Sequence, residues 1–377
     1  MTEFIQKLFS QEAHDVEGVY LLTLYVDTFD ETRSDVETSV KSFLKEGFEK
    51  NKTLEKEHDV RKKLWEEIFQ KLKNKEYFKR GLGIFARFSV EGEILDIEVV
   101  DLYISPETDV YVGKDYNLDQ LFWINNLAKN SIVLNLQFNQ AEIYTLRGED
   151  LTLKENLEYD LEEDLKEYKQ KFSPTKGSEI YHGTGESNKE RQNFEFLKLF
   201  FSDVVDILKK YESKLSDVEY IIVFRSSFFD VISDYMQKQL KKVFLFDPII
   251  FTKNIEDESS LQKESKKALH DAQMASQEKL LEDSKENYDL LAQGWDEVCE
   301  ASKLGRVENL FFVMNVKKEG YIGSDGFVYT SAVENSKKVE NILPRLIRQT
   351  LEHGGNVYVF KDNEELAEKG VIAGLRF

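Results

Sequence analysis

Residues Gln349–Val359 (QTLEHGGNVYV) carry the clearest local signal in this 377-residue chain. Gly354 and Gly355 separate a polar, helix-compatible segment from the apolar run Val357-Tyr358-Val359. Glycine commonly closes helices because it adopts the left-handed backbone conformation without a steric penalty. The stretch therefore predicts a helix that ends near His353, where the helix dipole favours a cationic side chain, followed by a buried strand.

Segments on both sides of this stretch extend the pattern through the C-terminal part of the chain. Trp295–Arg306 (WDEVCEASKLGR) precedes the apolar run Val307–Val316, and the chain finishes with Val371–Phe377 (VIAGLRF). Cys299 stands among apolar helix positions, which is typical of a small core residue. A single cysteine excludes a disulfide framework and any multi-thiolate zinc site, and it fits a reducing compartment.

The centre of the chain alternates strand and helix signals. Ile132–Tyr144 (IVLNLQFNQAEIY) contains two apolar runs about Asn139-Gln140, which predicts a β-hairpin. After an acidic stretch, a long helix is predicted from Phe194, because apolar residues recur along one helical face. A strand at Tyr220–Phe224 and a helix through Tyr235–Leu240 follow.

A glycine-containing segment, Tyr181–Arg191 (YHGTGESNKER), lies between the hairpin and the long helix. Gly183 and Gly185 stand one residue apart among small polar groups, and a helix start follows them. This arrangement predicts a mobile loop whose backbone can approach a large partner closely.

The N-terminal part, residues 1–129, predicts an α/β domain. Val19–Asp27 (VYLLTLYVD) is short, apolar and rich in branched and aromatic residues, as buried strands are. Strands are also predicted at Leu82–Phe88 and Leu95–Ile104. Helical spacing relates two sets of apolar residues between these strands: Val36, Val40, Phe43, Leu44 and Phe48, then Val60, Leu64, Ile68 and Leu72.

The order of these segments resembles that of the archaeo-eukaryotic peptide-chain release factor and Pelota superfamily, including its bacterial Balon-like hibernation factors. The most specific matches are Thr-Leu-x-x-Gly-Gly from Thr350 and Ala-x-Leu-Arg-aromatic from Ala373. The resemblance implies an α/β (α+β) fold class with three domains. These are an N-terminal α/β domain at 1–129, a central release-factor-like domain with a mixed sheet and a long helix at 130–255, and a C-terminal L7Ae-like α/β/α domain at 256–377.

The resemblance also assigns a role to the loop. In the superfamily, a Gly-Gly-Gln loop enters the ribosomal peptidyl-transferase centre, whereas Thr184-Gly185-Glu186 stands at the corresponding place here. A carboxylate would carry negative charge toward an RNA-lined site where an oxyanion develops. The resemblance therefore implies an rRNA-contacting loop without peptide hydrolysis. Its residues are His182, Gly183, Thr184, Gly185, Glu186, Ser187 and Arg191.

The codon-reading motifs of the superfamily are absent from the sequence. The tetrapeptide Asn-Ile-Lys-Ser does not occur, and the family's cysteine-containing motif cannot exist in residues 1–129, which contain no cysteine. We therefore do not expect stop-codon decoding.

Enzyme chemistry at the same loop is the alternative. Glu186 as a general base would need a raised pKa and a positioned substrate. Ser187 with His182 suggests a nucleophile and its base, but the pattern Gly-x-Ser-x-Gly is absent. Gly183-x-Gly185 could cradle a phosphate, yet neither a Walker motif nor a full dinucleotide fingerprint accompanies it. The other histidines have no ligand-like spacing: His14, His58, His270 and His353. We expect no catalytic residues, metal or cofactor.

The charge balance limits how the chain can bind nucleic acid. With 51 Lys and Arg against 71 Asp and Glu, the formal net charge is −20, which argues against a broad basic surface and against DNA binding. Basic clusters occur at Lys71–Arg80, at Lys238–Lys242, and at Arg345 with Arg348, and each is typical of a solvated helix face or a small contact patch. The N-terminus lacks a signal-peptide pattern and no apolar run approaches bilayer length, so we expect a cytoplasmic protein without membrane contact.

The resemblance to release factors and Pelota implies a ribosome-binding translation factor that occupies the A site and contacts rRNA without releasing peptide. Elongation factor Tu or another translational GTPase is the expected protein partner. One use is ribosome hibernation under stress, and another is a Pelota-like rescue of stalled ribosomes. A hydrolase or nuclease that uses residues 182–191 is the third possibility. The loss of both codon-reading and hydrolysis motifs favours hibernation.

Overall fold

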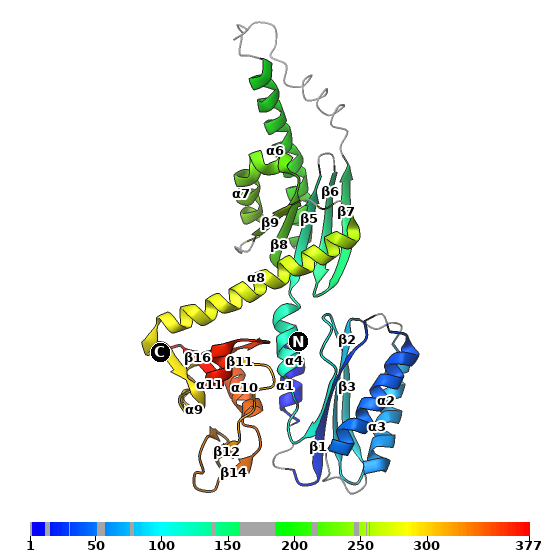
Figure 1. Cartoon of the computed structure of the whole chain (residues 1–377), viewed down its shortest axis with the longest axis vertical. Helices are drawn as coiled ribbons and strands as arrows, with labels where there is room; N and C mark the ends of the chain where they lie inside the picture. The colour runs from blue at the N-terminus through cyan, green and yellow to red at the C-terminus, as the bar shows by residue number, and fades with distance from the viewer. Residues whose placement is uncertain are drawn as a thin grey trace. The chain divides into compact units, whose positions relative to one another are not determined.

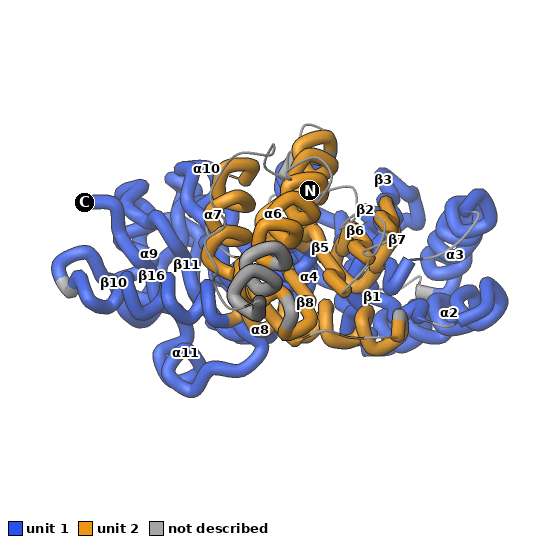
Figure 2. The backbone as a smooth tube through the Cα atoms, turned by 90° about the horizontal axis from the view of Figure 1, so that it is seen from above, with its two compact units in different colours: residues 1–128, 275–377 blue, residues 129–274 orange. Residues whose placement is uncertain are grey.

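A computed structural model describes residues 2–11, 16–29, 31–50, 57–75, 79–137, 140–158, 185–212, 218–244, 249–253, 255 and 257–377. The chain forms two compact units, of residues 1–128 with 275–377 and of residues 129–274 (Figure 2). The alternation of helices and strands confirms the α/β fold class. The three-domain boundaries at 129 and 255 stay a prediction.

The N-terminal part of the first unit is an antiparallel sheet in the order β3-β2-β1-β4. Its elements are α1 (Thr2–Phe9), β1 (Val19–Asp27), α2 (Arg33–Lys50), α3 (Glu57–Lys73), β2 (Gly81–Ser89), β3 (Ile94–Leu102), β4 (Asp109–Gly113) and α4 (Asp119–Leu127). Helices α2 and α3 lie together along one face of this sheet (Figure 1). Leu22, Leu24 and Val26 of β1 pack in the cluster with these helices, whereas Leu21 and Tyr25 pack in the cluster that contains α1 and α4. Because both faces are buried, β1 is apolar along most of its length, with Thr23 and Asp27 as its polar residues, as the sequence predicts.

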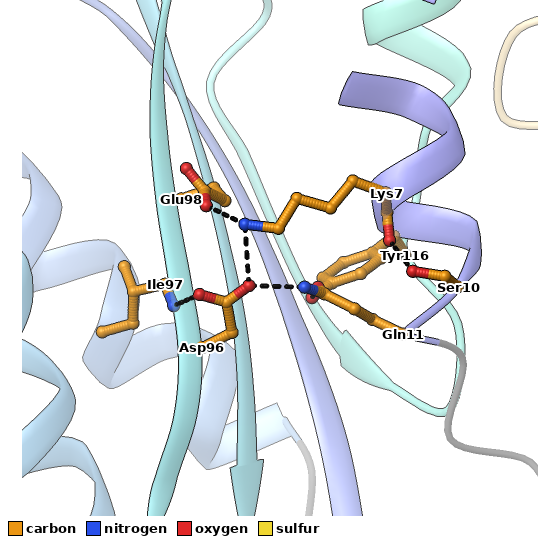
Figure 3. A network of polar contacts seen from close by, with 7 residues as sticks. All are labelled: Lys7, Ser10, Gln11, Asp96, Ile97, Glu98 and Tyr116. Carbon is orange, nitrogen blue, oxygen red and sulfur yellow. Dashed lines mark hydrogen bonds and ion pairs between the residues drawn. The ribbon is translucent and has the colours of Figure 1, made fainter. Parts of the chain in front are cut away.

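A polar network holds α1 against β3 (Figure 3). The Lys7 ammonium lies 3.1 Å from Asp96 Oδ2 and also contacts Glu98. Gln11 donates its amide N–H to Asp96 and accepts a hydrogen bond of 2.9 Å from the Tyr116 hydroxyl. The hydrogen bonds that the Lys7 ammonium donates to Glu98 and Asp96 raise the pKa of Lys7, so this lysine stays charged. The network fixes the N-terminal helix on the sheet.

The C-terminal part of the first unit contains a mixed sheet in the order β10-β16-β11-β15 and a small antiparallel sheet in the order β13-β12-β14. Its elements are η2 (Tyr288–Leu290), β10 (Leu291–Gln293), α9 (Gly294–Lys303), β11 (Val307–Val313), β12 (Gly320–Ile322), β13 (Val328–Tyr329), β14 (Lys337–Val339), α10 (Leu343–Glu352), β15 (Asn356–Phe360), α11 (Glu364–Lys369) and β16 (Val371–Leu375). Helix α10 ends with His353 as its C-cap, and Gly354 follows at a φ of 72°. The predicted glycine-capped helix and buried strand are therefore confirmed.

Residues 1–128 and 275–377 share one apolar core. Leu121 and Phe122 of α4 belong to the same buried cluster as residues of α10 and β15, and α4 packs against β15. The Asn126 side chain donates a hydrogen bond of 3.2 Å to the carbonyl of Val357. Arg348 of α10 donates one of 3.1 Å to the carbonyl of Phe9. The two ends of the sequence are thus packed together, which local sequence patterns do not predict.

The second unit is built on a mixed sheet in the order β7-β6-β5-β8-β9. Its elements are β5 (Asn130–Leu136), β6 (Gln140–Arg147), β7 (Asp150–Glu158), α6 (Gly185–Glu212), β8 (Val218–Arg225), η1 (Ser227–Ile232), α7 (Ser233–Val243), β9 (Ile249–Lys253) and the first part of α8 (Glu258–Glu286). Helices α6 and α7 cover one face, while Leu261 and Leu269 of α8 pack on the other face. The predicted hairpin is confirmed, because β5 and β6 pair antiparallel. The mixed sheet and the long helix are confirmed as well.

Candidate functional site

The C-terminal part of the predicted rRNA-contacting loop forms the beginning of α6. His182, Gly183 and Thr184 lie outside the described residues. Gly185, Glu186, Ser187 and Arg191 have helical backbone, so the helix begins at Gly185 rather than near Phe194. Glutamate, lysine and arginine are good helix formers, and this sequence preference allows α6 to extend into the segment that we expected to be a loop. Whether these residues contact rRNA stays a prediction.

Helix α6 is anchored by its later turns. Leu197, Phe201 and Val204 are almost fully buried in the cluster that α6 forms with the sheet and α7. The Ser202 hydroxyl lies 2.8 Å from the Tyr235 hydroxyl of α7. The first turns of α6 extend past the ends of the neighbouring strands (Figure 1). The sheet therefore fixes the direction in which the beginning of α6 points within its unit.

The first unit contains a groove of about 1160 Å³ between β4 and β14. The residues from Glu107 to Asp115, which include the edge strand β4, line one side, and Lys337–Asn341, which include the edge strand β14, line another. Asn315 and Lys317, which follow β11, also line it. Its lysines come from separate parts of the sequence: Lys50, Lys114, Lys317, Lys337 and Lys338.

Lys114 is held in one position at this groove. Its ammonium donates hydrogen bonds to the carbonyls of Val19, at 2.5 Å, and Val16, at 3.4 Å, and lies 4.3 Å from the centre of the Tyr20 ring. Burial lowers the pKa of Lys114, and the positive charge of Lys337 lowers it further. Two like charges from distant segments therefore act on each other across the groove.

Tyr111 and Asp119 lie beside the same groove. The Lys317 ammonium lies 5.7 Å from the centre of the Tyr111 ring. Burial, with the negative charges of Asp115 and Glu340, raises the pKa of Tyr111 to about 12, so its hydroxyl stays protonated at neutral pH. Asp119 accepts a hydrogen bond of 3.0 Å from the backbone N–H of Asn315, and burial raises the pKa of this carboxyl to about 6. Asp119 thereby links α4 to the segment that carries Lys317.

Two of the basic clusters that stand out in the sequence, Lys71–Arg80 and Arg345 with Arg348, contain residues with structural contacts. Arg345 donates a hydrogen bond to the Gly326 carbonyl, and Arg348 forms an ion pair of 2.7 Å with Glu352. Lys75, within the first cluster, forms an ion pair of 2.7 Å with Asp101. Sequence reasoning missed the groove lysines because positions 114, 317 and 337 are far apart along the chain. No local signal relates them.

The remaining candidates for chemistry have structural explanations. Cys299 is 5% exposed, and burial raises the pKa of its thiol to about 12, which fits a core residue. The His353 ring lies 2.8 Å from the Gln349 carbonyl, at the end of α10. Within the described ranges, no three His, Cys, Asp or Glu side chains are grouped to hold a metal ion. In the same part of the chain, every helix is too short or too polar to span a bilayer.

Comparisons with known proteins identify similar solved structures. No family model matches the chain, and no curated protein matches it. The chain is similar to the archaeal translation termination factor aRF1, with 17% identity, 100% of this chain and 97% of that chain covered, and a TM-score of 0.24. It is similar to Dom34 of S. cerevisiae, a translation termination-like factor, with 14% identity, 79% of each chain covered and a TM-score of 0.41. It is also similar to Archaeoglobus fulgidus Pelota, with 14% identity, 78% of this chain and 79% of that chain covered, and a TM-score of 0.34.

Proposed function

We propose that this protein binds the ribosome, occupies its A site without releasing peptide, and acts in ribosome hibernation under stress. The observation that carries the proposal is the position of Thr184-Gly185-Glu186. This tripeptide stands where the release factors that the sequence resembles have Gly-Gly-Gln. Its last two residues, Gly185 and Glu186, begin a 28-residue helix that is anchored on the sheet of its own unit. Because the later turns of α6 are packed on the sheet, the beginning of this helix has a fixed direction within its unit and could contact a large partner there. The carboxylate of Glu186 opposes stabilisation of an oxyanion there.

The charge of the molecule supports a limited set of contacts. A chain with a net charge of −20 gains little from nonspecific attraction to RNA, so local basic regions and a protein partner must contribute to its binding. The groove lined by Lys114, Lys317 and Lys337 is one such region. Elongation factor Tu or another translational GTPase is the partner that we propose, and the cytoplasm is the location.

Peptide release is the first test of the proposal. The purified full-length protein should release no peptide above background from ribosomes that carry a labelled peptidyl-tRNA and a stop codon in the A site. A true release factor serves as the positive control. Release at a rate near that of the control would exclude the proposed non-hydrolytic role.

Ribosome binding separates hibernation from rescue. We expect the protein to cosediment with idle ribosomes at least as well as with ribosomes stalled at the end of a truncated mRNA. Cryo-electron microscopy of the idle complex should show density in the A site. Binding to stalled ribosomes alone would favour the rescue function, and the absence of cosedimentation with either would refute the ribosomal function.

A further inference from the structure

The groove between β4 and β14 brings together three lysines that are distant in sequence. Lys114 directly follows β4, Lys317 lies in the segment after β11, and Lys337 begins β14. The walls approach each other where the Lys317 ammonium reaches the Tyr111 ring of β4. The volume of about 1160 Å³ exceeds the ~300–1,000 Å³ that is usual for small-molecule pockets. The groove is therefore large enough for an occupant bigger than a usual small-molecule ligand.

The charges that line this groove favour an anionic occupant. Glu107 forms an ion pair of 2.5 Å with Lys361, and Asp115 is only 6% exposed. Two other acidic residues, Asp109 and Glu340, line the groove beside the lysines. Lys50 and Lys338 are likewise ion-paired, with Glu46 at 2.7 Å and with Glu319 at 2.8 Å. With five lysines and four acidic residues, the lining has a small positive excess in a chain whose net charge is −20.

Lys114 is held ready to meet an anion in the groove. Its ammonium is already oriented by the carbonyls of Val16 and Val19, so little conformational entropy is lost when it meets a ligand. The positive charge of Lys337 acts on the same ammonium. An anion bound between these two ammonium groups would reduce the repulsion between them. This reduction contributes favourably to the free energy of anion binding.

We propose that the β4–β14 groove binds the sugar-phosphate backbone of a single-stranded RNA segment, with Lys114, Lys317 and Lys337 as its phosphate contacts. RNA carries one negative charge per nucleotide, so a strand presents phosphates at regular intervals to the three lysines that line the groove. An acidic peptide would present carboxylates only where its sequence supplies them. This inference rests on the proposed function, since a ribosome-bound protein would meet such a strand in rRNA.

The test measures the salt dependence of RNA binding by the full-length protein. A fluorescein-labelled twelve-nucleotide oligouridylate is titrated with the protein between 25 and 150 mM KCl, and the anisotropy is recorded. The variant Lys317→Gln/Lys337→Gln removes two charges from exposed positions. The matched control, Lys318→Gln, removes an exposed charge adjacent to Lys317 that does not line the groove. Thermal melting of each protein checks its folding.

The expected result is a change in the slope of log affinity against log salt concentration. For single strands, the slope falls by about 0.7 for each phosphate that the protein no longer neutralises. The double variant should therefore bind more weakly and show a slope shallower by about 1.4, whereas Lys318→Gln should match the wild type. Equal slopes for all three proteins would overturn the proposal. No binding by the wild type at 25 mM KCl would also overturn it, as would displacement of the RNA by poly-glutamate at lower charge concentration than by unlabelled RNA.

Ribosome cosedimentation separates this inference from the proposed function. If the wild type cosediments with ribosomes but the groove variants leave the RNA slope unchanged, the groove proposal fails and the ribosomal function stands. If RNA binding depends on Lys317 and Lys337 but no ribosome binding occurs, the ribosomal function fails and the groove remains an RNA site.

Discussion

At the scale of single residues, Asp119 is the buried carboxyl with the clearest energetic consequence. It is 8% exposed, and its principal polar contact is the backbone N–H of Asn315. Burial raises its pKa from 3.8 to about 6, although Asn315 and the charge of Lys317 oppose this effect. The folded state therefore binds the Asp119 proton more tightly than the unfolded state does. The contribution of Asp119 to stability is most favourable at low pH and declines as the pH rises from about 4 to 6.

We predict that Asp119→Asn stabilises the protein at neutral pH. The amide oxygen can still accept the hydrogen bond from Asn315, while the cost of burying a charge disappears. A pKa displaced by about two units corresponds to a gain of up to about 3 kcal/mol at pH 7.5. The difference in Tm between the variant and the wild type should be larger at pH 7.5 than at pH 5. A difference that does not change with pH would contradict the raised pKa.

The pair Gly354 and Gly355 gives a second residue-scale prediction. Gly354 has a φ of 72°, a conformation that asparagine tolerates, whereas a Cβ at Gly355 would lie 2.8 Å from the Val307 carbonyl oxygen. Gly355→Ala should therefore lower the free energy of unfolding by about 1–3 kcal/mol, because backbone atoms must shift. Gly354→Asn should cost less. Urea denaturation monitored by fluorescence tests this order, and equal losses would show that the close approach to Val307 is not restrictive.

Single residues also show how far the sequence determines the site. The end of α10 and the core position of Cys299 follow from local patterns, and both are confirmed. The convergence of Lys114, Lys317 and Lys337 could not be predicted, because it depends on packing between segments about 200 residues apart. His182 lies outside the described residues, so the predicted loop contact remains untested.

At the scale of elements, long apolar runs predicted strands correctly, whereas strands rich in charged residues were not predicted. Strand β1 has the predicted bounds, Val19–Asp27, because an almost continuous apolar run identifies it. Strand β7 was missed, since Asp150–Glu158 is acidic and mostly exposed at the edge of its sheet. Charged side chains are common on edge strands because they discourage pairing with other chains. Strand β4 was missed because it has only five residues.

Helix α6 provides a matched test of how its anchoring depends on burial. Leu197 is 1% exposed, whereas Leu199 on the same helix is 48% exposed. Leu197→Ala should lower the free energy of unfolding by about 2–5 kcal/mol, because it leaves a cavity between α6 and the sheet. Leu199→Ala should change it by no more than about 0.5 kcal/mol. Chemical denaturation of both variants checks the prediction, and similar losses would contradict the described face of α6.

At the scale of the whole molecule, one of the two compact units is discontinuous in sequence. Residues 129–274 form one compact unit, and in the sequence they separate the two segments that make up the other unit. Two apolar clusters lie within residues 129–274, while the cluster containing α4 also contains residues of β11, β15 and α10. Sequence patterns are local and predicted consecutive domains. Packing between the ends of the chain is a property of the assembled core.

The discontinuous unit predicts how shortened chains behave. A chain in which residues 129–274 are replaced by a Gly/Ser linker of about twenty residues should unfold in one thermal transition. Its Tm should exceed that of residues 1–128 alone, because the shorter fragment exposes Leu121 and Phe122 and lacks the hydrogen-bond partners of Asp119 and Asn126. Differential scanning calorimetry measures both values. If the domains were independent, residues 1–128 would have the same Tm in both proteins, and residues 275–377 would unfold in a separate transition. The measurement therefore distinguishes one shared core from independent domains.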